Sequence, residues 1–463
     1  MKESIHLQLL ATQPSSSIVS DNGIVIHTST RRLKYKTKNE ALVEACRKIF
    51  DQKESLHATI QVLAEKDPDQ LRSLFLVLKR LYHENGIGIL YHLDQIHAGT
   101  ILPMAPMPLI ADFAPLSGTI GIARSAKLHR HNEVMIFEAP LARARLEIQH
   151  SALITKISQW MAKATVKVEE SLLGQLLVEI SLGDLITGDT KPAPELDGWG
   201  SHELFFQFRS RHGFHTYPSG ALFLAAGQRE PPPANRNQNE SEKRITLNKP
   251  KSIKSGTLES VIAARVSTSN YKDEQPSLNQ LSELLWRTMR QTGEFSMTIE
   301  DKAGQPHIFP LKSRPVPSGG SVHEIDAYLL VNSPGSLQKG LWRYDDKLHE
   351  LVMVTTLNDD TELILLHGQI SAGLEKLPPM MLIFSARFDR MMWKYSALPL
   401  AAILKHVGVL YEIFYLVATD MSLGIRGLGS GESRAFSKAI QVHPAVESSV
   451  GEMLIGLPTQ QIT

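Results

Sequence analysis

Apolar residues recur at helical spacing between Leu400 and Ala418, which predicts a helix over residues 400–418. One side of this helix carries Leu400, Ile403, Leu404, Val407, Tyr411, Phe414, Tyr415 and Ala418. The opposite side is nearly as apolar and carries Val409, Leu410, Ile413, Leu416 and Val417. A helix that is apolar all round is buried on all sides. The pattern therefore predicts burial either at the centre of a domain or between two subunits, and both alternatives remain open.

The N-terminal part of the chain shows the same order of patterns twice. In residues 1–100, strand-like alternation at 23–35 precedes helical patterns at 39–51, 54–65 and 68–84 and a strand at 87–91. In residues 101–227, strands at 134–137 and 144–148 precede helical patterns at 151–162 and 168–181 and a strand at 183–186. Strands, helices and a returning strand are the order of a winged-helix module. The sequence therefore predicts two winged-helix-like units.

Winged-helix modules bind DNA in regulators, whereas similar modules in peptide-modifying enzymes capture the leader of a precursor peptide. The formal net charge of the chain is only +1, so no overall basic character attracts nucleic acid. This balance favours peptide binding over DNA binding, and a purely structural role remains a third alternative.

A polar segment follows these units at residues 228–255. It has no apolar periodicity and contains three consecutive prolines, Pro231 to Pro233. The sequence therefore predicts a solvated linker here, followed by a third and largest domain at residues 256–463.

The composition sets outer limits on the function. With 42% hydrophobic and 21% charged residues, the chain has the composition of a globular protein. Its single cysteine, Cys46, excludes an intramolecular disulfide framework and a cysteine-rich metal site. The N-terminus lacks the apolar stretch of a secretory signal, and no uncharged apolar run has spanning length. We expect a cytoplasmic protein that binds neither nucleic acid nor membrane.

A glycine-rich stretch follows the 400–418 helix and contains Gly424, Gly427 and Gly429. Such a loop leaves backbone N–H groups free to face an anion. The glycines follow a helix instead of linking a strand to one, so the dinucleotide-binding fingerprint does not fit. Upstream, Arg265 and Ser267 stand on alternate residues, and in an extended segment they point the same way and can hold one phosphate.

Several blocks together resemble the flavin-dependent nitroreductase superfamily. They are the 400–418 helix with its glycine-rich loop, the RPVPSGG block at 314–320, Tyr328, and the GLWRY block at 340–344. Within the superfamily they resemble the SagB-type, cyanobactin-oxidase-like dehydrogenases, which are FMN enzymes that oxidise azolines to azoles in ribosomal peptide natural products. The resemblance covers residues 195 to 458, with weaker similarity before them.

The block from Trp199 to Gly213 is similar to one that closes the N-terminal part of SagB-type proteins. It departs from their pattern at Glu203 and Gln207. Two interpretations of its arginines, Arg209 and Arg211, remain open. They pair with carboxylates and hold domains together, or they shape a peptide channel.

The resemblance implies an FMN site with assigned residues. Arg265 and Ser267 match the family's phosphate-binding pattern, whereas Ser269 stands where the family has a second cation. Arg426 or Arg434 are candidates to replace that cation. The segment formed by Pro317, Ser318, Gly319 and Gly320 matches the one that lies along the flavin ring near its reactive N5, and Gly424, Gly427 and Gly429 complete the cofactor-binding set.

The resemblance also assigns Lys394 and Tyr395 as the acid/base pair of an azoline oxidase. Aromatising an azoline removes a proton from one ring carbon and a hydride from its neighbour. A lysine must be desolvated, or lie near another cation, to act as a base near neutral pH. In the alternative interpretation, Lys394 pairs with an acid and Tyr395 packs.

We therefore expect an α+β chain in which two winged-helix-like units precede a nitroreductase-type domain, an antiparallel sheet wrapped by helices. The resemblance implies a homodimer with FMN at the subunit interface, an azoline-containing precursor peptide as substrate, and a cyclodehydratase partner. Two other functions remain open: a flavin-dependent reductase of small nitro- or quinone-like acceptors, and a flavin-free scaffold for peptide-modifying partners.

Overall fold

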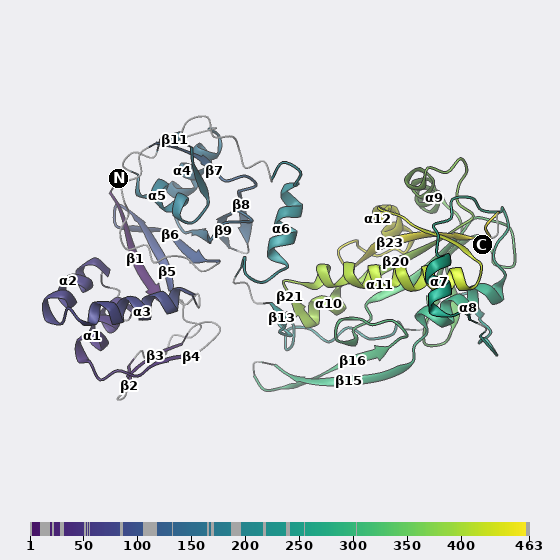
Figure 1. Cartoon of the computed structure of the whole chain (residues 1–463), viewed down its shortest axis with the longest axis horizontal. Coiled ribbons are helices and arrows are strands. Elements are labelled where there is room, and N and C mark those ends of the chain that lie inside the picture. The colour runs from purple at the N-terminus through teal and green to yellow at the C-terminus, as the bar shows by residue number, and fades with distance from the viewer. Residues whose placement is uncertain are drawn as a thin grey trace. The chain divides into compact units, whose positions relative to one another are not determined.

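A computed structural model of the chain shows two compact units, residues 1–217 and 218–463 (Figure 1). The structure describes residues 2–9, 19–20, 23–27, 32–50, 52, 54, 56–83, 87–104, 118–131, 133–163, 166–167, 171–186, 196–215, 219–237, 241–253, 255–301 and 303–459.

The first unit is built on an antiparallel sheet that draws strands from both halves of the unit. Among the described residues its strand order is β1 (Glu3–Leu9), β5 (Ile87–Leu93), β6 (Ile96–Pro103), β10 (Ala144–Ile148), β9 (Val134–Glu138) and β8 (Lys127–His131). Two small sheets flank it: β2 (Val19–Ser20), β3 (Gly23–His27) and β4 (Arg32–Tyr35), and β11 (Val166–Lys167), β7 (Thr119–Ile122) and β12 (Gly183–Ile186).

The helices of this unit are α1 (Glu40–Phe50), α2 (Leu56–Lys66), α3 (Gln70–His83), α4 (Ser151–Met161), α5 (Leu172–Glu179) and α6 (Ser201–Arg209). Helices α1 to α5 lie close to the ranges expected from the apolar periodicity, whereas α6 was not expected. The two expected modules, however, share one sheet and one apolar core, because β6 pairs with β10. The boundary expected at residue 100 therefore falls inside a compact unit, and the winged-helix character of its halves remains a prediction.

Arg209, at the end of α6, joins that helix to the sheet of the same unit. Its guanidinium donates to Glu138 Oε2 at 3.2 Å and to the carbonyls of Ala139, Pro140 and Phe214 at 2.9–3.1 Å. The carboxylate-pairing interpretation of Arg209 is therefore confirmed. Arg211 is exposed.

The second unit is built on an antiparallel seven-stranded sheet. Its strand order is β14 (Arg244–Thr246), β19 (Glu350–Thr355), β18 (Gly340–Asp345), β17 (Ile325–Val331), β20 (Met380–Arg387), β23 (Glu447–Gly456) and β22 (Gly424–Gly427). A long hairpin, β15 (Gly293–Glu300) and β16 (Pro306–Ser313), and a short ribbon, β13 (Gly220–Ala221) and β21 (Tyr395–Ser396), lie beside it. This architecture confirms the expected α+β class.

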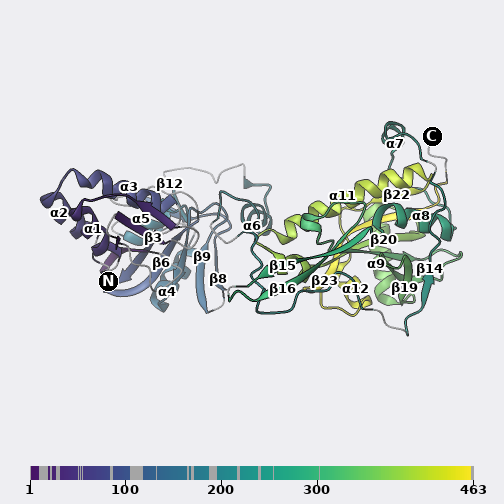
Figure 2. The ribbon, with the colours of Figure 1, turned by 90° about the horizontal axis from the view of Figure 1, so that it is seen from below.

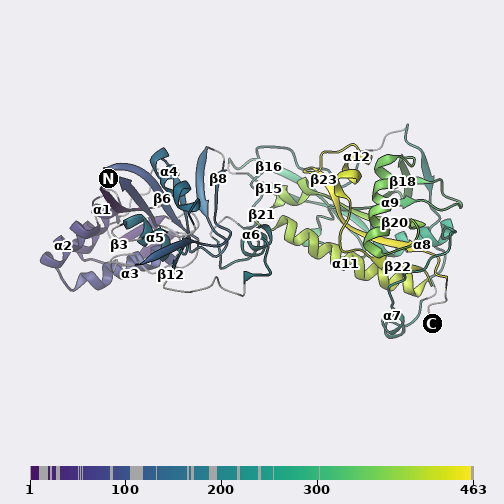
Figure 3. The same ribbon diagram turned by 90° about the horizontal axis from the view of Figure 1, so that it is seen from above.

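Helices cover both faces of this sheet, as the two rotated views show (Figures 2 and 3). One face packs against α8 (Leu278–Met289) and α11 (Pro399–Asp420), with α7 (Leu258–Ala264) and α10 (Phe388–Lys394) nearby. The other face packs against α9 (Asp359–Ala372) and α12 (Ser433–Ala439). Alternate residues of each strand face opposite sides, so Trp342 belongs to the first core and Leu341 to the second.

The segment expected to be a linker belongs to the second unit. β14 pairs with β19, Ala234 is buried, and Arg236 forms ion pairs with Asp326 and Glu447. The boundary between the units therefore lies before residue 228, in contrast to the expectation. The sequence pattern did not reveal this placement. Hydrogen bonds and ion pairs anchor the segment, and such contacts leave no apolar periodicity.

Helix α11 matches the range expected from the sequence, but the chain itself buries only one of its faces. Ile403, Leu410 and Phe414 are buried, whereas Leu400 and Leu404 remain 42% and 44% exposed. Burial on all sides is therefore not achieved within one chain. By length and composition the helix could also cross a membrane, in contrast to the sequence expectation, but its buried face packs against α8 and β23.

Candidate functional site

The Pro317–Gly320 segment makes a tight turn between β16 and β17. Gly320 has φ of +60°, a conformation that side chains with a Cβ rarely adopt. A Cβ atom at Gly320 would lie 2.2 Å from Lys394 Nζ and 2.6 Å from the Tyr395 hydroxyl. The glycine therefore lets the backbone approach the two predicted catalytic side chains.

Lys394 is the last residue of α10, and its neighbour fixes that helix. The indole of Trp393 stacks on Phe309 with ring centroids 4.8 Å apart. Lys394 Nζ donates to the Gly320 carbonyl at 3.0 Å, and the side chain is buried. Desolvation by this burial lowers the pKa of Lys394. No carboxylate among the described residues forms an ion pair with it, in contrast to the alternative in which Lys394 pairs with an acid.

Tyr395 is placed by the short β13–β21 ribbon. It lies opposite Ala221, and the Phe223 N–H donates to the Lys394 carbonyl at 3.1 Å. Burial and the nearby Glu324 carboxylate raise the pKa of the Tyr395 phenol. The phenol is therefore neutral near pH 7 and keeps a proton to donate, while the lowered pKa of Lys394 increases the fraction of neutral amine, which can accept one.

The turn is also held by a pair of residues that the sequence analysis did not identify. His406 Nδ1 lies 2.6 Å from Glu324 Oε1, and the Gly319 N–H donates to His406 Nε2 at 2.8 Å. Nε2 accepts in this bond, so Nδ1 carries the proton and donates it to the carboxylate. Glu324 also accepts from Ser318 Oγ at 3.3 Å. The only sequence signal was a histidine within an otherwise apolar helix.

His323, next to this pair, has no catalytic geometry of its own. It is 6% exposed, and burial together with Arg314 and Lys312 lowers its pKa to about 3. Its backbone N–H donates to Ser318 Oγ at 3.0 Å. This geometry makes His323 a local structural residue.

A second cluster gathers near the C-terminal end of α11. Ser267 Oγ lies 3.0 Å from the Tyr415 hydroxyl, which accepts from the Gly427 N–H at 2.7 Å. The Arg265 guanidinium lies over the Tyr415 ring, 5.4 Å from its centroid. The structure therefore brings Arg265, Ser267 and Gly427 together, and it adds Tyr415, which the sequence analysis assigned only to the apolar pattern.

Arg426 lies beside Ser269, where the family pattern has a cation. Its Nη1 donates to Ser269 Oγ at 3.1 Å. Gly424, at the start of β22, lets the backbone lie against Thr268, since a Cβ there would come within 2.8 Å of the Thr268 methyl group. A Cβ at Gly429 would meet nothing within 4 Å. Because it contacts Ser269, Arg426 is better placed than Arg434 to replace the missing cation.

Both clusters include a residue of α11: His406 belongs to the first cluster and Tyr415 to the second. Nine residues of α-helix correspond to roughly 13 Å, so an extended ligand is needed to reach from one to the other. The second cluster offers the guanidiniums of Arg265 and Arg426 and the hydroxyls of Ser267 and Tyr415, and no described carboxylate pairs with either arginine. This donor set fits a phosphate, and the glycine turn fits a flat ring, so the residues present fit FMN.

Comparisons with known proteins agree with this arrangement. Residues 262–457 match the family model described as the nitroreductase family. A Methanocaldococcus jannaschii protein named as a nitroreductase is 24% identical over 200 residues, which are 42% of this chain and 91% of that protein.

Solved structures with similarity include two proteins named as nitroreductases. That of Ralstonia eutropha is 22% identical, covers 53% of this chain and 100% of its own, and has a TM-score of 0.36. That of Anabaena variabilis is 13% identical, covers 98% of this chain and 80% of its own, and has a TM-score of 0.40. The E. coli microcin synthetase McbBCD complex with truncated pro-MccB17 bound is 19% identical, covers 48% of this chain and 80% of its own, and has a TM-score of 0.34.

The sequence match spans β15–β23 and the residues of both clusters. It supports a nitroreductase-type domain at residues 262–457.

Proposed function

We propose that the chain is an FMN-dependent dehydrogenase that oxidises thiazoline or oxazoline rings to azoles in a ribosomally made precursor peptide. The observation that carries this proposal is the position of the Lys394–Tyr395 pair. Lys394 Nζ lies 3.0 Å from the Gly320 carbonyl, on the segment that resembles the ring-binding turn of the family. A desolvated lysine at this turn supplies the base that azoline oxidation requires.

The reaction removes one proton and one hydride from adjacent ring atoms and forms one new double bond. FMN, when bound, accepts the hydride and so supplies the two-electron oxidation. Lys394 takes the proton as a neutral amine at Nζ, and its lowered pKa increases the neutral fraction near pH 7. Tyr395 keeps its proton, because its pKa is raised, and orients the ring through its hydroxyl.

The remaining chain residues bind and position. Arg265, Ser267 and Arg426 would hold the phosphate of FMN, and Arg426 replaces the cation missing at Ser269. The Glu324–His406 pair fixes the Gly319 N–H and with it the turn that faces the ring.

The proposal also covers the assembly. The half-exposed apolar face of α11, including Leu400 and Leu404, supports a homodimer through this helix. Residues 1–217 exceed what a small-molecule reductase requires and suit a peptide-binding role, with a cyclodehydratase as the enzyme that supplies the azoline. DNA binding and a purely structural role are the alternatives for that unit.

A second candidate function is reduction of small nitro- or quinone-like acceptors. It is favoured by the match to a protein named as a nitroreductase, 91% of which aligns with only 42% of this chain. The buried Lys394 argues for the first candidate, since reduction of such acceptors does not need a base that removes a ring proton.

The deciding experiment compares wild type with Lys394→Ala, both loaded with FMN. We expect the variant to keep its flavin absorbance. The rate of oxidation of an azoline peptide, monitored as a mass loss of two hydrogens, should fall by about 10²–10⁴-fold. Lys339→Ala, at an exposed position before β18, is the matched control and should retain the rate. Azoline oxidation at the wild-type rate in Lys394→Ala would refute the role of this lysine.

Two further outcomes separate the alternatives. Purified protein without flavin absorbance, even after incubation with FMN, would favour the scaffold. Turnover of a nitroaromatic acceptor that Lys394→Ala leaves unchanged, without azoline oxidation by wild type, would favour the reductase.

A further inference from the structure

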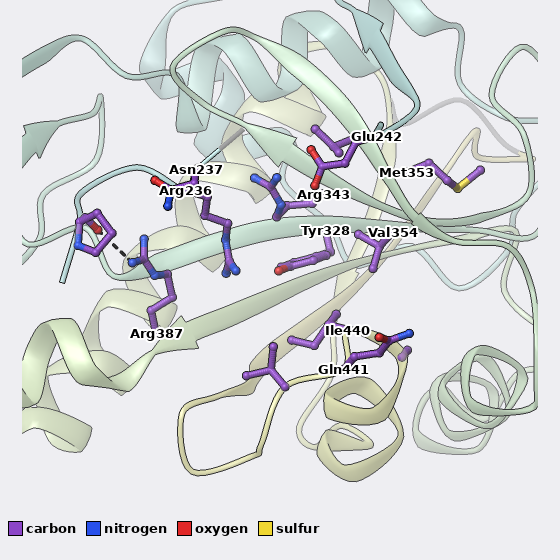
Figure 4. Close-up of a pocket in the computed structure, with 14 residues that line it drawn as sticks. Arg236, Asn237, Glu242, Tyr328, Arg343, Met353, Val354, Arg387, Ile440 and Gln441 are labelled. Carbon is purple, nitrogen blue, oxygen red and sulfur yellow. Dashed lines mark hydrogen bonds between the residues drawn. The ribbon is translucent and has the colours of Figure 1, made fainter. Parts of the chain in front are cut away.

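The second unit contains a cavity of 670 Å³ on the sheet face that packs against α9 and α12 (Figure 4). It lies on the opposite face of the sheet from the turn at Gly320. Its walls come from β17, β18, β19 and β20, from residues 233–237 and Glu242, and from the turn after α12 at 439–442. A cavity of this size accommodates a small organic molecule.

Arg343 occupies an unusual position in this cavity. It lies opposite Tyr328 on β17 and opposite Val352 on β19, so the three side chains form one row on the same sheet face. Its neighbour on that face, Leu341, is fully buried in the core. A charged residue therefore stands where the strand pattern calls for an apolar one.

The side chain of Arg343 is 9% exposed and forms no hydrogen bond or ion pair with the described residues. Nearby Arg236 is different, because it donates to Asp326 at 2.9 Å and to Glu447 at 2.5 Å. A guanidinium that is taken out of water without a carboxylate partner is costly. A bound anion would supply the partner that the described residues lack.

A second arginine in the cavity, Arg387, forms no ion pair with a described carboxylate. It donates to the carbonyls of Pro233 at 2.9 Å and Ala234 at 3.4 Å. Among the described residues of the cavity wall, the one carboxylate is that of Glu242, which Arg244 holds at 2.6 Å. Figure 4 shows Arg236, Arg343 and Arg387 on the same side of Tyr328. The cavity therefore carries positive charge that the described residues do not neutralise.

We propose that this cavity binds a small organic anion through Arg343 and Arg387. A carboxylate or a phosphate would accept from the guanidiniums, whose planar donors match both groups. Val352, Val354 and Ile440 supply apolar wall for the body of the molecule. Tyr328 does not contribute a donor, because its hydroxyl donates to Glu447 at 3.0 Å. The inference does not depend on the proposed azoline oxidation.

The first test is the stability of the ligand-free protein. Arg343→Met removes the charge, keeps the length of the side chain and suits the apolar surroundings. We expect its unfolding midpoint to rise by about 2–4 °C, since an unpaired buried cation is lost. Lys339→Met, at an exposed position before β18, removes the same charge and should leave the midpoint unchanged. A lower midpoint in Arg343→Met would show that the guanidinium already has partners in the chain.

The second test is calorimetric titration of the full-length, FMN-saturated protein with phenyl phosphate, benzoate and neutral benzyl alcohol. We expect one of the two anions to bind, and its charge type identifies the recognised group. Arg343→Met and Arg387→Gln should each weaken that binding by about ten- to a hundredfold. Lys339→Met should not.

Flavin absorbance is recorded during each titration, because phenyl phosphate could compete for the phosphate cluster near Arg265. Binding that releases flavin and is unaffected by Arg343→Met would place the anion at the cofactor site and overturn the proposal. Failure of both anions to bind, or equal binding of benzyl alcohol, would overturn it as well. Retained flavin and azoline oxidation in Arg343→Met would leave the proposed function intact in either case.

Discussion

The charged groups on the two faces of the seven-stranded sheet differ in their hydrogen-bond partners. On the face of α8 and α11, Lys394 donates to the Gly320 carbonyl, and His406 bridges Glu324 and the Gly319 N–H. On the face of α9 and α12, Arg343 is also buried but has no hydrogen bond with a described residue. The first site is organised by the chain's own contacts, whereas in the second the proposed anion would supply the partner that the described residues lack.

This difference separates two ways of building a site. Preorganised groups cost little reorganisation when a reaction occurs, so they suit catalysis. An unpaired buried charge gains its partner only on binding, so it suits recognition of that partner. Both arrangements arise on one sheet because alternate residues of each strand point to opposite faces.

The largest effect should follow from disrupting the preorganised turn. In Gly320→Ala, the new Cβ would lie 2.2 Å from Lys394 Nζ, at a residue with φ of +60°. The lysine must move, so we expect azoline oxidation at saturating FMN to fall by about 10²–10⁴-fold, as on loss of the base. Gly198→Ala, where a Cβ meets nothing within 4 Å, is the control. A wild-type rate in Gly320→Ala would show that this contact does not place the base.

The next effect concerns the exposed face of α11. Sedimentation should give a particle of twice the 51.5 kDa chain mass. In Leu404→Asp an exposed residue becomes charged, so the folded chain should persist while the dimer dissociates, because a buried unpaired charge costs several kcal/mol. Leu410→Asp, at a residue only 3% exposed, should instead unfold the second unit. A wild-type particle of single-chain mass would refute the dimer.

The sequence predicted the local elements well, because they depend on periodicity. The range of α11 and the hairpin of β18 and β19 followed from apolar spacing and turn residues. The position of residues 228–255 could not be predicted, since Arg236 pairs with Asp326 and Glu447, which are far away in the sequence.

The candidate site was predicted where motifs are local and missed where contacts are long-range. Lys394 and Gly320 were both identified, but that they touch emerges only from the fold. His406 and Tyr415 were not assigned, because each lies on an apolar helix and acts through residues from other elements. Arg343 was given no role of its own, since an arginine in a strand gives no sign of being buried without a described partner.

A smaller effect is expected at the phosphate cluster. Arg265→Ala should lower FMN affinity by about ten- to a hundredfold, the value of a lost charge-assisted hydrogen bond. The measurement is flavin fluorescence on titration of the apoprotein. Ser269→Arg should leave the affinity equal or higher, because it restores the cation that Arg426 replaces. Unchanged affinity in folded Arg265→Ala would move the phosphate site elsewhere.

The smallest effect is a difference in the pH dependence of stability between variants on the two faces of the sheet. His323 is buried near Arg314 and Lys312, which with burial lower its pKa to about 3, against roughly 6.5 in an unfolded chain. The unfolded state therefore binds more protons between these values, and this histidine lowers the stability as the pH falls through that window. In His323→Asn, which tolerates the native φ of +45°, the loss of stability from pH 7 to pH 5 should be smaller, by at most about 1.4 kcal/mol per pH unit. Denaturant unfolding at both pH values measures this difference.

Arg343→Met should keep the wild-type pH dependence, because an arginine stays charged throughout. A common slope for wild type and His323→Asn would show that His323 is not held neutral in the turn.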